Sequence, residues 1–122
     1  MAFPQITVKA TNIELGGGLS ALIDQKLAPL GKYIRDNATD STCRVEVEKL
    51  SEHQSGKIYR IEINLFTDGK SYRATATEEQ TEKAIDTARD ELKHELQRVQ
   101  GKHKSMLRRG GQALKDMLRF GK

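Results

Sequence analysis

The sequence predicts an α+β fold in the order β-α-β-β-β-α, a four-stranded sheet with two helices packed on one face. Two observations predict it. Four segments alternate apolar and polar residues, which is the pattern of half-buried strands, and two longer segments repeat apolar residues at helical spacing. Three of the strand segments follow one another directly, so they form a meander with one polar face, and the layout resembles that of a double-stranded-RNA-binding domain.

The first strand is expected at residues 5–11, "QITVKAT", where alternate residues face the core. A helix follows the loop "GGG", with apolar residues at helical spacing over residues 19–34. Pro29 lies inside this helix. We expect it to kink or interrupt the helix near Ala28, because proline lacks an amide proton and its ring clashes with the preceding turn.

Three further strands are expected at "CRVEVEKL", "KIYRIEINLF" and "SYRATAT", and "TDGK" supplies an Asp-Gly hairpin turn between the last two. Each strand places its apolar side chains at alternate positions on one face. These residues are Cys43, Val45, Val47, Ile61, Ile63, Leu65, Tyr72, Ala74 and Ala76.

The second helix is the segment "TEEQTEKAIDTARDELKHELQRV". We expect it to start near Thr77, since acidic residues crowd its first turn, where the helix dipole favours them. Gly101 is expected to loosen the helix, and "RRGG" at 108–111 to end it. Its buried stripe is Ala84, Ile85, Ala88, Leu92, Leu96 and Val99.

Length and composition indicate one soluble globular domain. The chain has 122 residues, 36% hydrophobic and 31% charged, which suits a modest single core. It contains no apolar stretch of about 20 residues, the length that spans a bilayer. The start, "MAFPQITVKA", lacks the basic and then apolar pattern of a signal peptide, so we expect a cytoplasmic location. The single cysteine, Cys43, excludes an internal disulfide and suits a reducing compartment.

Positive charge is concentrated at the C-terminal end. The net charge is +4, but residues 98–122 hold eight Lys and Arg against one Asp, whereas residues 1–97 hold thirteen against sixteen acids. Such a bias favours a polyanionic partner, either nucleic acid or an anionic membrane. The chain therefore divides into an α+β domain of residues 1–104 and a basic C-terminal tail of residues 105–122.

The sequence contains no pattern of residues that is typical of a catalytic or metal site. His53, His94 and His103 do not have the spacing of a metal site. Cys43 is on the inward side of a strand, as a packed core thiol would be. "GGG" lacks the Lys-Ser or Lys-Thr ending of a phosphate loop, and the carboxylates form no acid/base pair. We expect no enzyme, no cofactor and no small-molecule substrate.

The basic residues of the long helix form two flanks beside the buried stripe and continue beyond it. One flank holds Arg89, Lys93 and Lys104, the other Arg98 and Lys102, and Arg108 and Arg109 follow. Complementing the helix dipole accounts for one or two such cations, not for all of them. No strand carries the aromatic pair of a single-strand stacking platform, so the pattern favours contact with the backbone and shape of folded RNA.

Two segments carry a resemblance to a known family. "ITVKATNIEL", followed by "LSALIDQKLAPLGKYI", and the long "EEQTEKAIDTARDELKHELQRVQGKHK" resemble the opening strand and the two helices of ribosome hibernation-promoting factors, also called ribosome-associated inhibitors or sigma-54 modulation proteins. The resemblance covers about residues 5–105 and implies that the α+β domain of residues 1–104 binds the ribosome. The length resembles that of the short form, which lacks an additional C-terminal domain.

The resemblance implies a function without chemistry. Members of the family occupy the small ribosomal subunit between head and body, on 16S rRNA, where tRNA and mRNA would bind, and they block translation in stressed or non-growing cells. Lys26 and Lys32 of the first helix, and Arg98 and Lys102 of the second, match basic positions of the family. With the cations of the helical flanks, the expected rRNA contacts are Lys26, Lys32, Arg89, Lys93, Arg98, Lys102, Lys104, Arg108 and Arg109.

Two other interpretations remain open. A generic double-stranded RNA-binding module has a similar layout of helices and sheet. Alternatively, the segment "LKDMLRFGK" is an amphipathic docking element through which an adaptor contacts a protein or, less favoured, a membrane surface.

Overall fold

The structure, a computed structural model, contains one four-stranded sheet and helical segments in the predicted order β-α-β-β-β-α. It describes residues 3–14, 16, 18–35, 40–50 and 56–108, with side chains as far as Gly101. The elements are β1 (Ile6–Thr11), α1 (Leu19–Leu27), the 3-10 helix η1 (Ala28–Tyr33), β2 (Thr42–Lys49), β3 (Tyr59–Thr67), β4 (Lys70–Glu78) and α2 (Thr81–Arg108). The predicted α+β class is confirmed.

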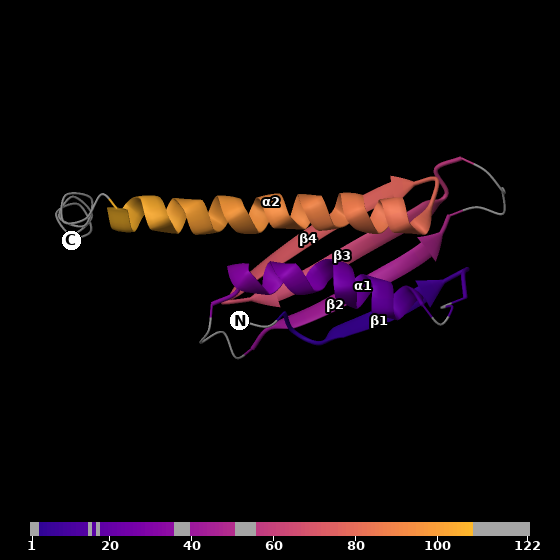
Figure 1. Cartoon of the computed structure of the whole chain (residues 1–122), viewed down its shortest axis with the longest axis horizontal. Coiled ribbons are helices and arrows are strands. Elements are labelled where there is room, and N and C mark those ends of the chain that lie inside the picture. Colours follow the sequence, from indigo (N-terminus) through magenta and orange to yellow (C-terminus); the bar gives the residue numbers. More distant parts are fainter. Residues whose placement is uncertain (1–2, 15, 17, 36–39, 51–55, 109–122) are drawn as a thin grey trace.

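The strands lie in the sheet in the order in which they occur in the chain. β1 pairs with β2 in parallel, and the α1–η1 segment is the crossover that a parallel pair requires. β2, β3 and β4 form the predicted antiparallel meander. Both helices cover the same face of the sheet, α1 on the β1–β2 side and α2 along β3 and β4 (Figure 1).

One apolar cluster joins the two helices to the inward face of the sheet. It contains the predicted inward residues of β2 and β3, two of the three predicted in β4, and the predicted stripe of α2 from Ala84 to Leu96. Tyr72, the third residue of β4, is half-buried, as are Val99 of α2 and the inward residues of the edge strand β1. The alternation read from the sequence is therefore the pattern that builds the core.

Pro29 interrupts the first helix as predicted. α1 ends at Leu27, and η1 continues from Ala28 with Pro29 in its first turn. The tighter winding of a 3-10 helix shifts the following residues relative to an α-helix. Leu30 and Gly31 remain buried, and the hydroxyl of Tyr33 accepts a hydrogen bond of 2.9 Å from Gln97 of α2. The change of helix type at Pro29 thus brings η1 into contact with α2.

The predicted start of the long helix, near Thr77, is wrong. Thr77 is paired with Arg60 in the β3–β4 ladder, and α2 begins at Thr81. The hairpin turn at Asp68 and Gly69, both with positive φ, sets a register that extends β4 through Glu78. Thr77 and Glu78 suit both the start of a helix and the polar end of a strand. Pairing with β3 places them in the strand.

The expected loosening at Gly101 is also absent, because α2 continues through it to Arg108. One glycine in a helix interior costs roughly 0.5–1 kcal/mol, which neighbouring helix-forming residues can offset. The last turns of α2 extend beyond the sheet (Figure 1). The helix also crosses residue 104, where the sequence predicts the boundary between domain and tail, and "GG" at 110–111 lies outside the described residues.

The outward face of the sheet is polar and carries a charge network centred on Glu62. Its carboxylate accepts hydrogen bonds from Asn64 at 3.1 Å and Arg60 at 3.0 Å, and it lies 3.0 Å from Arg73 Nε. The hydrogen bond from Asn64, with the bond from Arg60 and the charges of both arginines, holds the pKa of Glu62 below its ordinary value of 4.5.

This network predicts a contribution to stability that depends on pH. Since the folded-state pKa of Glu62 is depressed, its stabilising effect is complete above the unfolded-state value and is lost as pH falls through the folded value. The difference in free energy of unfolding between the wild type and Glu62→Gln, measured by urea denaturation, should therefore shrink as pH is lowered below about 4.5. Asn64→Ala should raise the pKa of Glu62 in an NMR titration; an unchanged value would contradict this account.

Candidate nucleic-acid interface

A shallow groove runs between the α1–η1 segment and α2, on the helical side of the molecule. Its volume is about 280 Å³, and it is lined by Lys26, Pro29, Leu30, Lys32, Tyr33, Arg89, Asp90 and Lys93. Four of the predicted rRNA-binding cations therefore meet there, two from each helical segment. One acidic residue, Asp90, is in the lining, so the groove has an excess of positive charge.

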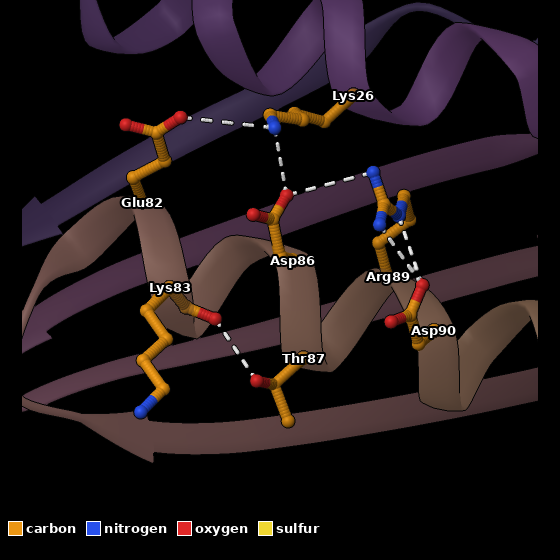
Figure 2. Close-up of polar contacts among 7 residues, drawn as sticks. All are labelled: Lys26, Glu82, Lys83, Asp86, Thr87, Arg89 and Asp90. Carbon is orange, nitrogen blue, oxygen red and sulfur yellow. Dashed lines mark hydrogen bonds and ion pairs between the residues drawn. The ribbon is translucent and has the colours of Figure 1, made fainter.

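Asp86 of α2 binds two of these cations (Figure 2). Its Oδ1 lies 2.8 Å from Nζ of Lys26 and 3.5 Å from Nη1 of Arg89. Glu82 adds a contact of 3.8 Å to the same lysine. Oδ1 of Asp86 is shielded from solvent, so the two cations supply the compensation that water would otherwise give. Lys26 and Arg89 are thus already paired inside the protein, and the contacts of Lys26 with Asp86 and Glu82 also tie α1 to α2.

Lys32 and Lys93 are different. Neither forms an ion pair with a carboxylate among the side chains that the structure describes. The ammonium of Lys32 lies 5.2 Å from the centroid of the Tyr33 ring, within the range of a cation–π contact, and the hydrogen bond from Gln97 fixes that ring. The groove is therefore lined by two cations that are paired with a carboxylate and by two that remain available to an external anion.

Arg98 lies on the opposite flank of α2, as the helical projection predicts. It pairs with Glu95 at 2.9 Å, one turn before it. Both residues act on Tyr72 of β4: its pKa is raised by burial, by Asp68 and by Glu95, and the positive charge of Arg98 lowers it. Arg98 therefore faces the β4 side of the helix and does not line the groove.

The remaining predicted cations continue beyond the groove. Lys102, Lys104 and Arg108 belong to the last turns of α2, whose backbone is helical and whose side chains the structure does not describe. Arg109 lies outside the described residues. A helix of 28 residues rises roughly 42 Å at 1.5 Å per residue, so α2 carries these positions well away from the core.

The groups with potential for chemistry lie apart from this groove. Cys43 is buried in β2, and burial raises the pKa of its thiol to about 12, which leaves almost no thiolate at neutral pH. His94 is exposed on α2. Within the described part of the chain, no three His, Cys, Asp or Glu side chains form a group with the geometry of a metal site. What this surface can do chemically is bind anions.

Two features of the site escaped sequence reasoning. Asp86 is 60 residues from Lys26, and no periodicity in the sequence links the two, so their pairing becomes visible only when α1 packs beside α2. Tyr33 directly follows Lys32, and this basic–aromatic neighbour pair is the signal that could have identified it.

Comparison with known proteins identifies the class. The model of the family described as sigma 54 modulation protein / S30EA ribosomal protein matches residues 6–104. The chain belongs to this family of ribosome-associated proteins, which confirms the resemblance to hibernation-promoting factors. No curated protein matches the chain.

Two solved structures have a similar fold. The N-terminal domain of Protein Y from Thermus thermophilus is 24% identical, with a TM-score of 0.64 over 80% of this chain and 98% of that chain. A ribosomal subunit interface protein from Coxiella burnetii is 15% identical, with a TM-score of 0.61 over 79% of this chain and 97% of that chain. At these identities the likeness supports the fold. In the described portion of this chain, no helix is both long and apolar enough to cross a membrane.

The division of the groove cations predicts different effects on stability. Lys26→Ala leaves a shielded carboxylate oxygen of Asp86 with one cation at 3.5 Å, so it should lower the free energy of unfolding by about 1 kcal/mol. Lys32→Ala removes an exposed side chain and should change it by less than about 0.5 kcal/mol. Chemical denaturation of both variants measures the difference, and equal effects would contradict the assigned roles.

Proposed function

We propose that this protein binds 16S rRNA of the small ribosomal subunit between head and body, and thereby also the whole ribosome. In this position it would block translation by occupying the sites of tRNA and mRNA in stressed or non-growing cells, in the cytoplasm. The family supports a ribosomal role, and the two similar structures are those of the Protein Y N-terminal domain and of a ribosomal subunit interface protein.

The observation that carries the proposal is the groove with its unneutralised cations. Lys32 of η1 and Lys93 of α2 both line the groove, so an rRNA phosphate group entering it would meet a cation from each helical segment. Charge-assisted contacts of this kind are stronger than neutral hydrogen bonds. Lys26 and Arg89 add to the positive electrostatic potential of the groove, but each would interact less strongly with a phosphate, because the carboxylate of Asp86 already compensates their charges.

The cations beyond the groove extend the same surface. Arg98 stands on the other flank of α2, and Lys102, Lys104, Arg108 and Arg109 follow in the sequence. Side chains on two flanks of a long helix suit a partner that surrounds the helix, as a cleft in folded RNA does. Inhibition by this route needs no bond to be made or broken, since occupancy of the cleft excludes other ligands.

Charge reversal in the groove tests the proposal. The double variant Lys32→Glu/Lys93→Glu should lose co-sedimentation with small subunits at moderate salt, because two phosphate contacts become repulsive. Wild-type binding should weaken steeply with salt, since each neutralised phosphate contributes a slope in log affinity against log salt of roughly −0.7 on a single strand and roughly −0.9 on duplex DNA.

The control for this experiment is Lys9→Glu/Lys57→Glu, which changes the net charge equally. Lys9 is on the outward face of the sheet and Lys57 precedes β3, so both are outside the groove. Equal loss of binding in both double variants would contradict a specific groove contact. A gel shift on plain duplex RNA separates the rival module: binding there as tight as to small subunits would favour a generic double-stranded RNA binder.

We further propose that residues 1–104 form the ribosome-binding domain and that residues 105–122 act as a separate basic tail. The family match ends at residue 104, although α2 continues to Arg108. Truncation after Gly110 should leave most small-subunit binding intact in the same sedimentation assay. If the truncated chain no longer binds, residues 111–122 are part of the rRNA interface; if it loses a protein or membrane partner alone, the docking alternative gains support.

A further inference from the structure

Phe66 stands on the outward face of the sheet, opposite the helices. Phe66 is 38% exposed to solvent. It is one of two large hydrophobic residues that are exposed in the described part of the chain, and Leu50 is the other. Its neighbours across the sheet are Thr42 of β2 and Ser71 of β4. Because the residues directly opposite Phe66 on both neighbouring strands are small, they leave part of the side chain exposed.

Two arginines lie one row along the sheet from the ring. Arg44 and Arg73 flank Asn64 on the neighbouring strands, and this row is two residues from Phe66 on the same face. Together they line a shallow depression of about 330 Å³ whose lining contains no acidic residue. Neighbouring strands are about 4.8 Å apart, so the two arginine positions are roughly 10 Å apart, on either side of the line through Phe66.

The polar groups of this row have spare capacity for a ligand. Arg44 is exposed and forms no ion pair with the carboxylates that the structure describes. The side chain of Arg73 is 64% exposed and contacts Glu62 through Nε, which leaves its terminal nitrogens available. Asn64 donates its amide to the same Glu62 and so presents its carbonyl oxygen as an acceptor.

Charge divides the outward face into two parts. The acids Glu46 and Glu48 lie toward the other end of the strands, where Lys9 and Arg60 pair with them. Glu62 lies between the two parts and contacts both Arg60 and Arg73. The end with Phe66 holds the two arginines. A ligand for this end therefore carries negative charge and a flat apolar group.

We propose that Phe66, Arg44 and Arg73 form a binding site for an unpaired nucleotide of single-stranded RNA. The base would stack on the Phe66 ring, one or both arginines would bind the flanking phosphates, and Asn64 would accept a hydrogen bond from an exocyclic amine or a ribose hydroxyl. An exposed aromatic ring on a sheet is the platform on which unpaired bases stack, and guanidinium groups contribute both charge and a stacking plane. A duplex offers no free base face to such a ring.

The site is independent of the groove, because the sheet separates them. The groove lies on the helical face, whereas Phe66 points away from the core on the other face. If both are occupied, the protein would contact folded rRNA through its helices and an unpaired RNA segment through its sheet. The inference does not require the proposed ribosomal function to hold.

Fluorescence anisotropy with a labelled single-stranded RNA heptamer tests the site at low salt, with a fully paired RNA hairpin as comparison. Phe66→Leu keeps an apolar side chain but removes the aromatic plane, and it should weaken binding of the heptamer about 10-fold. Phe66→Tyr should bind as the wild type does. Arg44→Gln should weaken binding several-fold and reduce the salt slope by about 0.7, as expected for one lost phosphate contact on a single strand.

The matched control is Lys9→Gln, which removes one positive charge from the same face outside the depression. It should leave heptamer affinity unchanged. NMR chemical shift changes on adding the heptamer should centre on Arg44, Asn64, Phe66 and Arg73, and they show whether the ring itself contacts the ligand.

The proposal is overturned if Phe66→Leu binds the heptamer as tightly as the wild type, or if it loses affinity for the paired hairpin to the same extent. The groove variant Lys32→Glu/Lys93→Glu keeps the two ideas apart. Loss of small-subunit binding in that variant, with the dependence of heptamer binding on Phe66 retained, would support both sites; a Phe66 effect without any groove effect would support this site and contradict the proposed function.

Discussion

The structure depends on one constraint: both helices must bury their apolar sides on a single face of the sheet. The inward residues of β2 and β3 form a continuous apolar surface, which Ala84, Ile85 and Leu92 of α2 complete from above. Burial of this kind is the dominant stabilising term in a domain of this size. Because the apolar layer is single, every other surface of the molecule is free to carry charge, and the two faces of the protein become chemically distinct.

The packing of the helices divides the cations between them into those that are paired with a carboxylate and those that are not. The distance between α1 and α2 allows Asp86 to bind Lys26, and this pair holds the two helices together. Asp86 also binds Arg89 of its own helix, so both cations lose part of their attraction for an external anion. Lys32 and Lys93 line the same groove, but neither forms an ion pair with a carboxylate that the structure describes. A basic helix surface is therefore not uniformly available to a phosphate, and the acidic residues within it set which cations remain available to an external anion.

The sequence allowed the fold to be predicted almost completely, because the periods of two and 3.6 are local and each reports burial directly. Pro29 was equally readable, since its effect on a helix does not depend on distant residues. The start of α2 was not readable. Thr77 and Glu78 suit either a strand end or a helix start, and the β3–β4 register, which belongs to the pair of strands, selects the strand.

For the functional surface, the sequence by itself determined which residues are basic, which flank of α2 each occupies, and that the charge increases toward the C-terminal end. It did not determine which of them are neutralised. That follows from tertiary structure, because the Lys26–Asp86 pair joins positions 60 residues apart and forms only when the core brings the helices together. The same holds for Phe66: alternation places it outward, but its row of arginines comes from two other strands, and only the sheet register assembles them.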